Sequence, residues 1–430
     1  MKKHVAVPRL PRIRQAWLRQ PALRKVLEVL NREGTTRIAG GAVRNALLGG
    51  AVTEIDLAST LTPQEVTRTA QSAGLTVHPT GLEHGTVMVV AEGTPFEVTT
   101  LRVDVETFGR RARVSFTDNW EADASRRDFT MNALYCDLNG QVHDPLGGYH
   151  DLRRHVVKFV GNPEARIEED HLRILRFFRF TAQYGSGAPD SRGLEHCVRL
   201  RRNLKSLSAE RVRQELWKLL SAPGALRMLR VMEKKGINRI LLGRPLNLKA
   251  FEYMVAADRA LKLAPDPLLR LHILTGSATE YRDILKLTNA EMDRLRALGP
   301  AGSVSPQLRP HERKIVLYQF GRQTYLDGVR CAWALSAVPK DPRWRRLLRF
   351  ERRASLPKFP VTGADLKALG IEAGPTMGAM LKALEDWWMA SGFPDDKHVI
   401  LKRLEALRRL PSSASFGHKQ PLKTEQGAED

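Results

Sequence analysis

The stretch GGAVRNALLGGAVTEIDL, residues 40–57, contains the pattern that decides the fold of this chain. Gly40 and Gly41 precede an apolar helical run, and glycine there lets backbone amides approach a phosphate group closely. Glu54 and Asp56 follow in a segment with strand character, separated by one apolar residue. Because alternate residues of a strand point to the same face, we expect these two carboxylates to share divalent cations. Mg²⁺ is the expected ion, since it accepts carboxylate and phosphate oxygens together.

Two further charged residues extend this predicted site. Arg44 lies one turn into the helical run, where its guanidinium would face the same phosphate. Glu97 is flanked by apolar residues on a predicted neighbouring strand, so a third carboxylate would complete a two-metal site. The alternative for Glu97 is a half-buried glutamate that pairs with an arginine such as Arg102.

The segment RRDFTMNAL, residues 126–134, places two arginines and an aspartate before an apolar strand. With a triphosphate nearby, Arg127 would suit a phosphate and Asp128 would suit ribose hydroxyls. The alternative is a charge cluster on the surface.

A second charged motif lies in EDHLRILRFFRF, residues 169–180. Asp170 and Arg173 are three positions apart, which predicts adjacent side chains on one helix face that could read one base. Arg176 and Arg179 continue the spacing, but each step of three rotates the direction by about 60°, so they would reach phosphate or backbone instead. The alternative is an internal ladder of salt bridges.

Composition indicates the class of partner. The 430 residues carry 69 Lys and Arg against 47 Asp and Glu, a net charge of +22, which favours a nucleic acid over a protein that is merely basic. No stretch approaches 18 apolar residues, so we expect no membrane-spanning helix. The three cysteines lie far apart without a CxxC pair, which predicts a reducing, cytoplasmic location.

The chain changes character near residue 160. Up to there, short β-rich runs alternate with turns and helical patterns, and we expect strands at residues 35–39, 54–58, 86–91, 96–101, 133–138 and 156–160. Residues 13–30 show helical spacing and predict a first helix, and from residue 165 onward the pattern is almost wholly helical. Residues 411–430 have the composition of a disordered tail.

The motifs, taken in order, resemble a known family. GGAVR, EIDL, HGTV (84–87), FEVTTLR (96–102), RRDFTMNAL, DPLGG (144–148) and EDHLRILRFFRF look like a class II tRNA nucleotidyltransferase, the CCA-adding enzyme of the tRNA nucleotidyltransferase/poly(A) polymerase family. The resemblance implies an α+β fold with a polymerase-β-like nucleotidyltransferase head, followed by an elongated all-α neck, body and tail. The implied boundaries are 1–160 for the head, 161–225 for the neck, 226–340 for the body and 341–410 for the tRNA-binding tail.

The resemblance also implies an activity and a role for each motif. The enzyme would add C, C and A to tRNA 3′ ends from CTP and ATP, with Mg²⁺ and release of pyrophosphate. The implied roles are nucleotide binding by Gly40, Gly41, Arg44, Arg127 and Asp128; catalysis by Glu54, Asp56 and Glu97, the first two as metal ligands; and base reading by Asp170 and Arg173, supported by Arg176 and Arg179. CTP and ATP both present an amine beside a ring nitrogen, which an aspartate and an arginine can pair, and mispaired UTP or GTP can be rejected by about 10⁴.

This sequence departs from the family pattern at two positions. Glu54 stands where the family usually has Asp, and the extra methylene predicts a cost in catalytic rate. Asn45 follows Arg44 where Asp is more common, which removes one orienting charge. Residues 104–125 resemble the family's mobile loop, which favours full CCA addition. The rival functions are a poly(A) polymerase of the same family and a non-catalytic RNA-binding relative.

Overall fold

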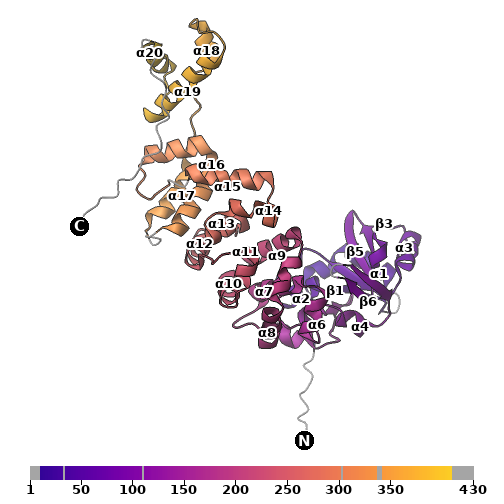
Figure 1. Cartoon of the computed structure of the whole chain (residues 1–430). Coiled ribbons are helices and arrows are strands. Elements are labelled where there is room, and N and C mark those ends of the chain that lie inside the picture. Colours follow the sequence, from indigo (N-terminus) through magenta and orange to yellow (C-terminus); the bar gives the residue numbers. More distant parts are fainter. Residues whose placement is uncertain (1–9, 32–33, 109–110, 302–303, 337–340, 409–430) are drawn as a thin grey trace, which may run out of the picture. The chain divides into compact units, whose positions relative to one another are not determined.

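A computed structural model of the chain describes residues 10–31, 34–108, 111–301, 304–336 and 341–408. The chain divides into two compact units, Met1–Leu295 and Arg296–Asp430 (Figure 1). The first unit contains all the strands of the described residues and the larger share of the helices. The predicted α+β head followed by a helical remainder is confirmed, whereas the finer boundaries at 160, 225 and 340 stay predictions.

A seven-stranded sheet forms the framework of the head, with the spatial order β3-β4-β5-β2-β1-β8-β9. Its strands are β1 (Thr36–Ala39), β2 (Asp56–Ser59), β3 (Thr76–Gly81), β4 (Thr86–Ala91), β5 (Thr94–Thr100), β8 (Tyr135–Cys136) and β9 (Val142–His143). The pairing of β2 with β5 is parallel, and the other pairs are antiparallel. The parallel pair sets Asp56 directly beside Glu97.

Short helices and one hairpin complete the head. They are η1 (Ala16–Arg19), α1 (Pro21–Leu30), α2 (Gly41–Leu47), α3 (Pro63–Ser72), η3 (Leu82–His84), the hairpin β6 (Arg102–Phe108) and β7 (Arg111–Phe116), α4 (Trp120–Ser125), η4 (Thr130–Asn132) and α5 (Gly148–Arg153). The segment expected as a mobile loop, 104–125, therefore contains most of the hairpin and α4. Its part in switching from C to A addition stays a prediction.

Three sequence-based boundaries needed correction. The single helix expected over 13–30 is interrupted, because Gln20 is held extended before Pro21, which starts α1. The strand expected over 54–58 begins only at Asp56, so Glu54 precedes it. Residues 156–160 form no strand and make only a single bridge between Phe129 and Phe159.

Aromatic packing explains that last difference. The ring of Phe159 lies 5.0 Å from that of Phe129 and 5.5 Å from that of Phe177, measured between ring centroids. Phe129 belongs to the head and Phe177 to the long helix α7 (Leu172–Tyr184), so the segment connects the sheet to the helices rather than extending the sheet.

The rest of the first unit is helical, as predicted. Its elements are α6 (Pro163–Glu169), α8 (Ser191–Arg199), η5 (Arg201–Ser206), α9 (Ala209–Ser221), α10 (Ala225–Lys234), α11 (Ile237–Leu242), α12 (Leu248–Leu261), α13 (Pro267–Thr275), η6 (Ala278–Tyr281), α14 (Arg282–Leu285) and α15 (Asn289–Ala301), which runs into the second unit. Helix α7 packs against α9 and α10 and is buried on nearly every side between its arginines.

The second unit contains α16 (Pro310–Leu335), α17 (Arg343–Arg353), α18 (Gly363–Ala368), α19 (Pro375–Ala390) and α20 (Lys397–Arg408). Its core centres on Trp388, which is fully buried. The tail predicted to be disordered, 411–430, lies outside the described residues. No helix of the described residues is both long and apolar enough to cross a membrane. Cys136, Cys197 and Cys331 are all buried free thiols.

Candidate active site

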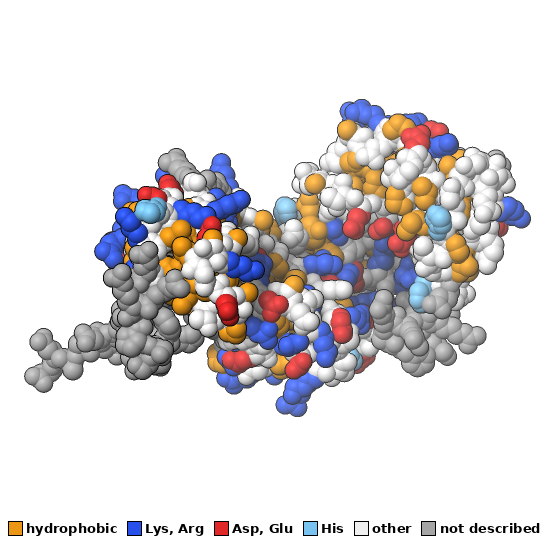
Figure 2. Space-filling model, turned by 90° about the horizontal axis from the view of Figure 1, so that it is seen from above, with side chains coloured by type: hydrophobic (Ala, Val, Ile, Leu, Met, Phe, Trp, Pro, Cys, Tyr) orange, Lys and Arg blue, Asp and Glu red, His pale blue; other side chains and the backbone are white. Residues whose placement is uncertain are grey.

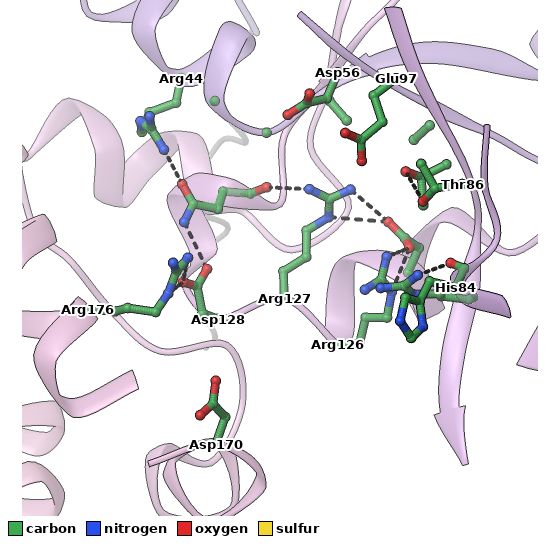
Figure 3. Close-up of a pocket in the computed structure, with 18 of the residues that line it drawn as sticks. Arg44, Asp56, His84, Thr86, Glu97, Arg126, Arg127, Asp128, Asp170 and Arg176 are labelled. Atoms are coloured by element: carbon green, nitrogen blue, oxygen red, sulfur yellow. Dashed lines mark hydrogen bonds and ion pairs between the residues drawn. The ribbon is translucent and has the colours of Figure 1, made fainter. Parts of the chain in front are cut away.

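A cavity of about 880 Å³ opens in the first unit between the sheet and helix α7. All the predicted site residues except Arg179 line it. In Figure 2 acidic and basic side chains lie side by side in a hollow of the surface. Figure 3 shows Asp56 and Glu97 pointing into the same space, with Arg127 across from them.

The carboxylates gather at the start of β2 and on β5. Asp56 is the register partner of Glu97, and Glu54 lies two residues before Asp56. Partial desolvation by the surrounding protein and the charge of Glu54 raise the pKa of Asp56, although Arg127 opposes the shift. Desolvation and the charge of Asp56 likewise raise the pKa of Glu97. Asp56 and its two acidic neighbours therefore repel each other, Glu54 acting on Asp56 and Asp56 on Glu97, and a bound cation would relieve this repulsion.

The geometry of the acidic pair differs from the expectation. Glu54 is not on the strand, so the alternation of strand side chains does not place it beside Asp56. Among the described residues no three His, Cys, Asp or Glu side chains form a complete metal-binding group. Oxygen donors from a bound triphosphate would have to supply the remaining ligands, which fits the coordination habit of Mg²⁺.

A buried arginine lies at the opposite side of the cavity. Arg44 of α2 is only 7% exposed, and one Nη donates to Oδ1 of Asn132 (2.5 Å). Burial lowers the pKa of Arg44. The preceding Gly40 has φ +63°, and a Cβ there would lie 3.1 Å from Nη1 of Arg127. A side chain at position 40 would thus be strained and would crowd Arg127.

Arg127 is held in place by a buried carboxylate, that of Asp123. Asp123 accepts from Nη2 of Arg127 (3.0 Å), from Nε of Arg126 (2.8 Å) and from the Tyr135 hydroxyl (2.7 Å). Burial alone would raise the pKa of Asp123, but the two arginines and the hydroxyl lower it below its usual value. Sequence reasoning assigned no role to Asp123, three residues before the RRDFTMNAL motif, or to Arg126, the first residue of that motif.

Asp128 connects the head to the helices. Its carboxylate accepts from Nδ2 of Asn132 (2.8 Å) and from Nε of Arg176 on α7 (2.8 Å). These contacts lower its pKa against the opposing effect of burial. Arg179 does not line the cavity, and it donates to Glu215 of α9 (2.8 Å). Its predicted contact with phosphate or backbone of the substrate stays a prediction.

Asp170 and Arg173 both line the cavity, but the prediction that they share one helix is wrong. Helix α6 ends at Glu169, and Asp170 is extended, with φ −154° and ψ 105°. Its Oδ1 accepts from the backbone N–H of Leu172 (3.1 Å) at the start of α7, a local contact that competes with a continuous helix. Arg173 lies in the first turn of α7.

Each member of this pair is already engaged. Oδ2 of Asp170 accepts from Nη2 of Arg211 on α9 (2.7 Å), and Arg173 forms an ion pair with Glu169. The ladder of salt bridges considered as the alternative for this motif is therefore present, and it lines the cavity. No local motif in the sequence indicated Arg211, which enters the site only through the packing of α9 against α7.

Comparisons with known proteins agree on one group. Residues 36–158 match the Poly A polymerase head domain, and residues 190–246 match a probable RNA and SrmB-binding site of polymerase A. The chain is 35% identical over 382 residues to CCA tRNA nucleotidyltransferase 1, mitochondrial, of Danio rerio, covering 86% of each chain. It is 33% identical over 369 residues to the CCA-adding enzyme of Geobacillus stearothermophilus, covering 80% of this chain and 86% of that one.

A solved structure is similar over nearly its whole length. The crystal structure of the Bacillus stearothermophilus CCA-adding enzyme in complex with CTP superposes with a TM-score of 0.73 at 29% identity, covering 90% of this chain and 98% of that one. A structure of the Thermotoga maritima CCA-adding enzyme complexed with tRNA shares the fold, with a TM-score of 0.63 at 21% identity.

Proposed function

We propose residue roles for this chain from the premise that it belongs to the CCA-adding enzymes of the tRNA nucleotidyltransferase/poly(A) polymerase family. It adds C, C and A to the 3′ end of tRNA from CTP and ATP without a nucleic-acid template. One observation supports the roles most directly: a single cavity is lined by an acidic cluster, by Arg44 and Arg127, and by Asp170 and Arg173.

The acidic cluster would hold the divalent cations that this family implies, and we propose Mg²⁺. Asp56 and Glu97 would be two of the donors, since they are register partners on adjacent strands, and Glu54 would add a third carboxylate from outside the strand. A divalent cation bound there would lower the pKa of the attacking 3′ hydroxyl and neutralise charge on the leaving group. The longer side chain of Glu54 offsets its position before β2, because it can reach back toward the space that Asp56 faces.

The arginines across the cavity would bind the triphosphate. Arg44 and Arg127 are held with few rotamers open to them, so little entropy is lost when they meet phosphate oxygens. Asp128 is fully engaged by Asn132 and Arg176, and we propose that it acts on the sugar through Asn132 rather than by direct contact.

Asp170 and Arg173 would read the base. The carboxylate would accept from the exocyclic amine and the guanidinium would donate to the ring nitrogen, a pairing that CTP and ATP share. Both groups must exchange their present partners, Arg211 and Glu169, for the base or share them with it. Arg176 supports the reading from the next turn of α7 by fixing Asp128.

The helical part would hold the tRNA through its phosphates. Four cations surround a second cavity of about 380 Å³, namely Arg201, Arg202, Lys205 and Arg239. None of the four forms an ion pair with a carboxylate of the described residues. They lie within the segment that matches a probable RNA-binding site. A cytoplasmic location stays a proposal, supported by the three buried free thiols.

The test is incubation with a tRNA transcript that lacks CCA, with Mg²⁺ and each labelled nucleotide in turn. Growth by two C residues and one A, followed by arrest, is the expected result. Open-ended addition of A would replace this reading with a poly(A) polymerase, and tRNA binding without growth would replace it with a non-catalytic RNA-binding protein.

A further inference from the structure

Arg44 differs from Arg127 and Arg176, two other arginines of the cavity, in the charge of its partners. Arg127 and Arg176 each form an ion pair with a carboxylate, Asp123 and Asp128 respectively. Arg44 forms no ion pair with a carboxylate of the described residues, although only 7% of its surface is exposed. A buried cation normally has a counter-charge, because desolvation of an unpaired charge is costly.

The partners of Arg44 are neutral and numerous. Its Nη2 donates to the hydroxyl of Tyr184 (2.8 Å) and to Oδ1 of Asn45 (3.0 Å), and its Nε donates to the same Oδ1 (3.2 Å). Its other Nη donates to Oδ1 of Asn132 (2.5 Å). The guanidinium carbon also lies 4.3 Å from the centre of the Tyr184 ring, within range of a cation–π contact. The arginine is thus fixed in place without being neutralised.

Both the nitrogen and the oxygen of the Asn45 side-chain amide help to hold Arg44 in place. Nδ2 donates to the backbone carbonyl of Ala51 (3.3 Å), which orients Oδ1 toward Arg44. The hydroxyl of Tyr184 donates to that same Oδ1 (3.3 Å), so the two residues support each other. An aspartate at position 45 would present an oxygen to the carbonyl of Ala51, where no donor could satisfy it, and would pair with Arg44 as an ion.

We infer that Asn45 and Tyr184 are positioning residues that hold Arg44 as an uncompensated cation for the triphosphate of the incoming nucleotide. The inference rests on the proposed function, because it assigns the phosphate ligand of that same site. Neither residue lines the cavity, so each acts through Arg44. The orienting charge that the sequence lacks at position 45 is replaced by an amide oxygen, a hydroxyl and an aromatic face, which leave the positive charge available.

The test uses inorganic triphosphate, which has phosphates but no base. Its Kd is measured by calorimetry for the wild type and for Tyr184→Phe and Asn45→Asp. We expect the Kd to rise about tenfold in Tyr184→Phe, which loses one charge-assisted hydrogen bond but keeps the ring. We expect a rise of about tenfold or more in Asn45→Asp, because the added carboxylate neutralises Arg44 and repels the ligand.

Kinetics distinguish this role from a general defect of helix α7, which contains Tyr184 and the base-reading Arg173. The KM for CTP and for ATP should rise by the same factor while kcat stays within about twofold, the signature of lost uniform binding. The preference for CTP over UTP should not change. Loss of that preference would mean that Tyr184→Phe distorts α7, and would overturn a role confined to Arg44.

Matched controls lie outside the cavity. Tyr281→Phe removes a hydroxyl that donates to the carbonyl of Leu242 (2.8 Å), and Asn247→Asp adds one negative charge at the start of α12. Both should leave the Kd for triphosphate unchanged. An unchanged Kd in Asn45→Asp and Tyr184→Phe overturns the inference, even if the wild type extends tRNA. If the two variants bind triphosphate more weakly than the wild type, as expected, but the wild type transfers no nucleotide, the proposed function is refuted and this inference stands.

Discussion

Nη2 of Arg211 lies 2.7 Å from Oδ2 of Asp170, and this ion pair joins helix α9 to the extended residue that precedes α7. Arg211 belongs to α9, whereas Asp170 occupies the extended residue between α6 and α7. The carboxylate proposed to read the base is therefore oriented from outside its own motif. Its direction depends on how α9 packs against α7.

Arg211→Ala should relax base selection. Without its orienting donor, Asp170 can turn away from the amine of CTP. The preference for CTP over UTP should therefore fall by about tenfold. This approaches the effect expected for Arg173→Ala, which removes one base contact worth about 1–3 kcal/mol. The measurement is single-turnover incorporation of each nucleotide. Arg213→Ala on the same helix is the control, because Arg213 pairs with Glu291 (2.7 Å) outside the cavity. A preference that survives Arg211→Ala would separate Arg211 from base reading.

Asp56→Ala should abolish CMP incorporation at saturating Mg²⁺, because it removes the carboxylate at the centre of the acidic cluster. Glu54→Asp should lower the rate in this chain. Glu54 starts from a position before β2, so the shorter side chain no longer reaches the space that Asp56 faces. This reverses the expectation from the family pattern alone, in which Asp restores the usual geometry. Near-normal turnover of Asp56→Ala would mean that the metals bind elsewhere.

Asp56→Asn should stabilise the metal-free protein at neutral pH. Desolvation and the neighbouring carboxylate raise the pKa of Asp56, as they do for Glu97. The folded state therefore binds protons more tightly than the unfolded state, so ionisation costs stability, and the cost disappears as the pH falls through the raised pKa. In chelator, the variant should melt above the wild type at pH 7, and the gap should narrow as the pH falls toward the raised pKa of Asp56. Mg²⁺ should raise the melting temperature of the wild type more than that of the variant.

Affinity for tRNA should fall steeply with salt. With a net charge of +22 the chain has ample cations, and contact with about six phosphates would lower affinity by about 10³ between 50 and 200 mM salt. The double change of Arg202→Ala and Arg239→Ala should reduce the slope of log K against log salt by about two. Arg24→Ala, which removes a cation paired with Glu28 on α1, should leave the slope unchanged. An unchanged slope in the double variant would exclude this cavity from the tRNA interface.

Trp388→Ala should destabilise the second unit alone. The indole ring lies 4.9 Å from Phe393 and 5.2 Å from Phe359, and its Nε1 donates to the carbonyl of Pro394 (2.8 Å). Its loss should cost about 3–5 kcal/mol. Calorimetry should show one transition shifted down. The Kd for inorganic triphosphate should stay unchanged, because the cavity proposed to bind it is lined only by residues of the first unit. Val399→Ala on the exposed side of α20 is the control. A weakened Kd for triphosphate would contradict this separation.

The fold and the site could be predicted from the sequence where the local residue pattern determines the local structure. The glycine pair at the start of α2, the strands expected at 86–91 and 96–101, and the helical run from residue 165 all appear within two residues of where they were expected. The meeting of Asp56 with Glu97 could also be expected, because both carboxylates lie on neighbouring strands of one sheet. Such features depend on spacing within a few residues, which a single sequence contains.

The remaining differences between the prediction and the structure arise from interactions that compete with the local pattern, and residue spacing does not reveal them. Glu54 falls outside its strand, and Asp170 interrupts a helix by binding a backbone N–H through its side chain. Tyr184 and Arg211 could not be assigned at all. Tyr184 follows Arg44 by 140 positions, and only the packing of α7 on the head brings the two together.

The buried thiols give this protein a set of internal reporters. Burial raises the pKa of Cys136 to about 12 and raises that of Cys197 well above its usual value, so neither forms a nucleophilic thiolate at neutral pH. An alkylating probe can therefore modify them only when the surrounding structure opens. Two of these thiols belong to the first unit, and Cys331 belongs to the second. The labelling rate at each thiol would thus record the opening of each unit in the same tube, without an engineered tag.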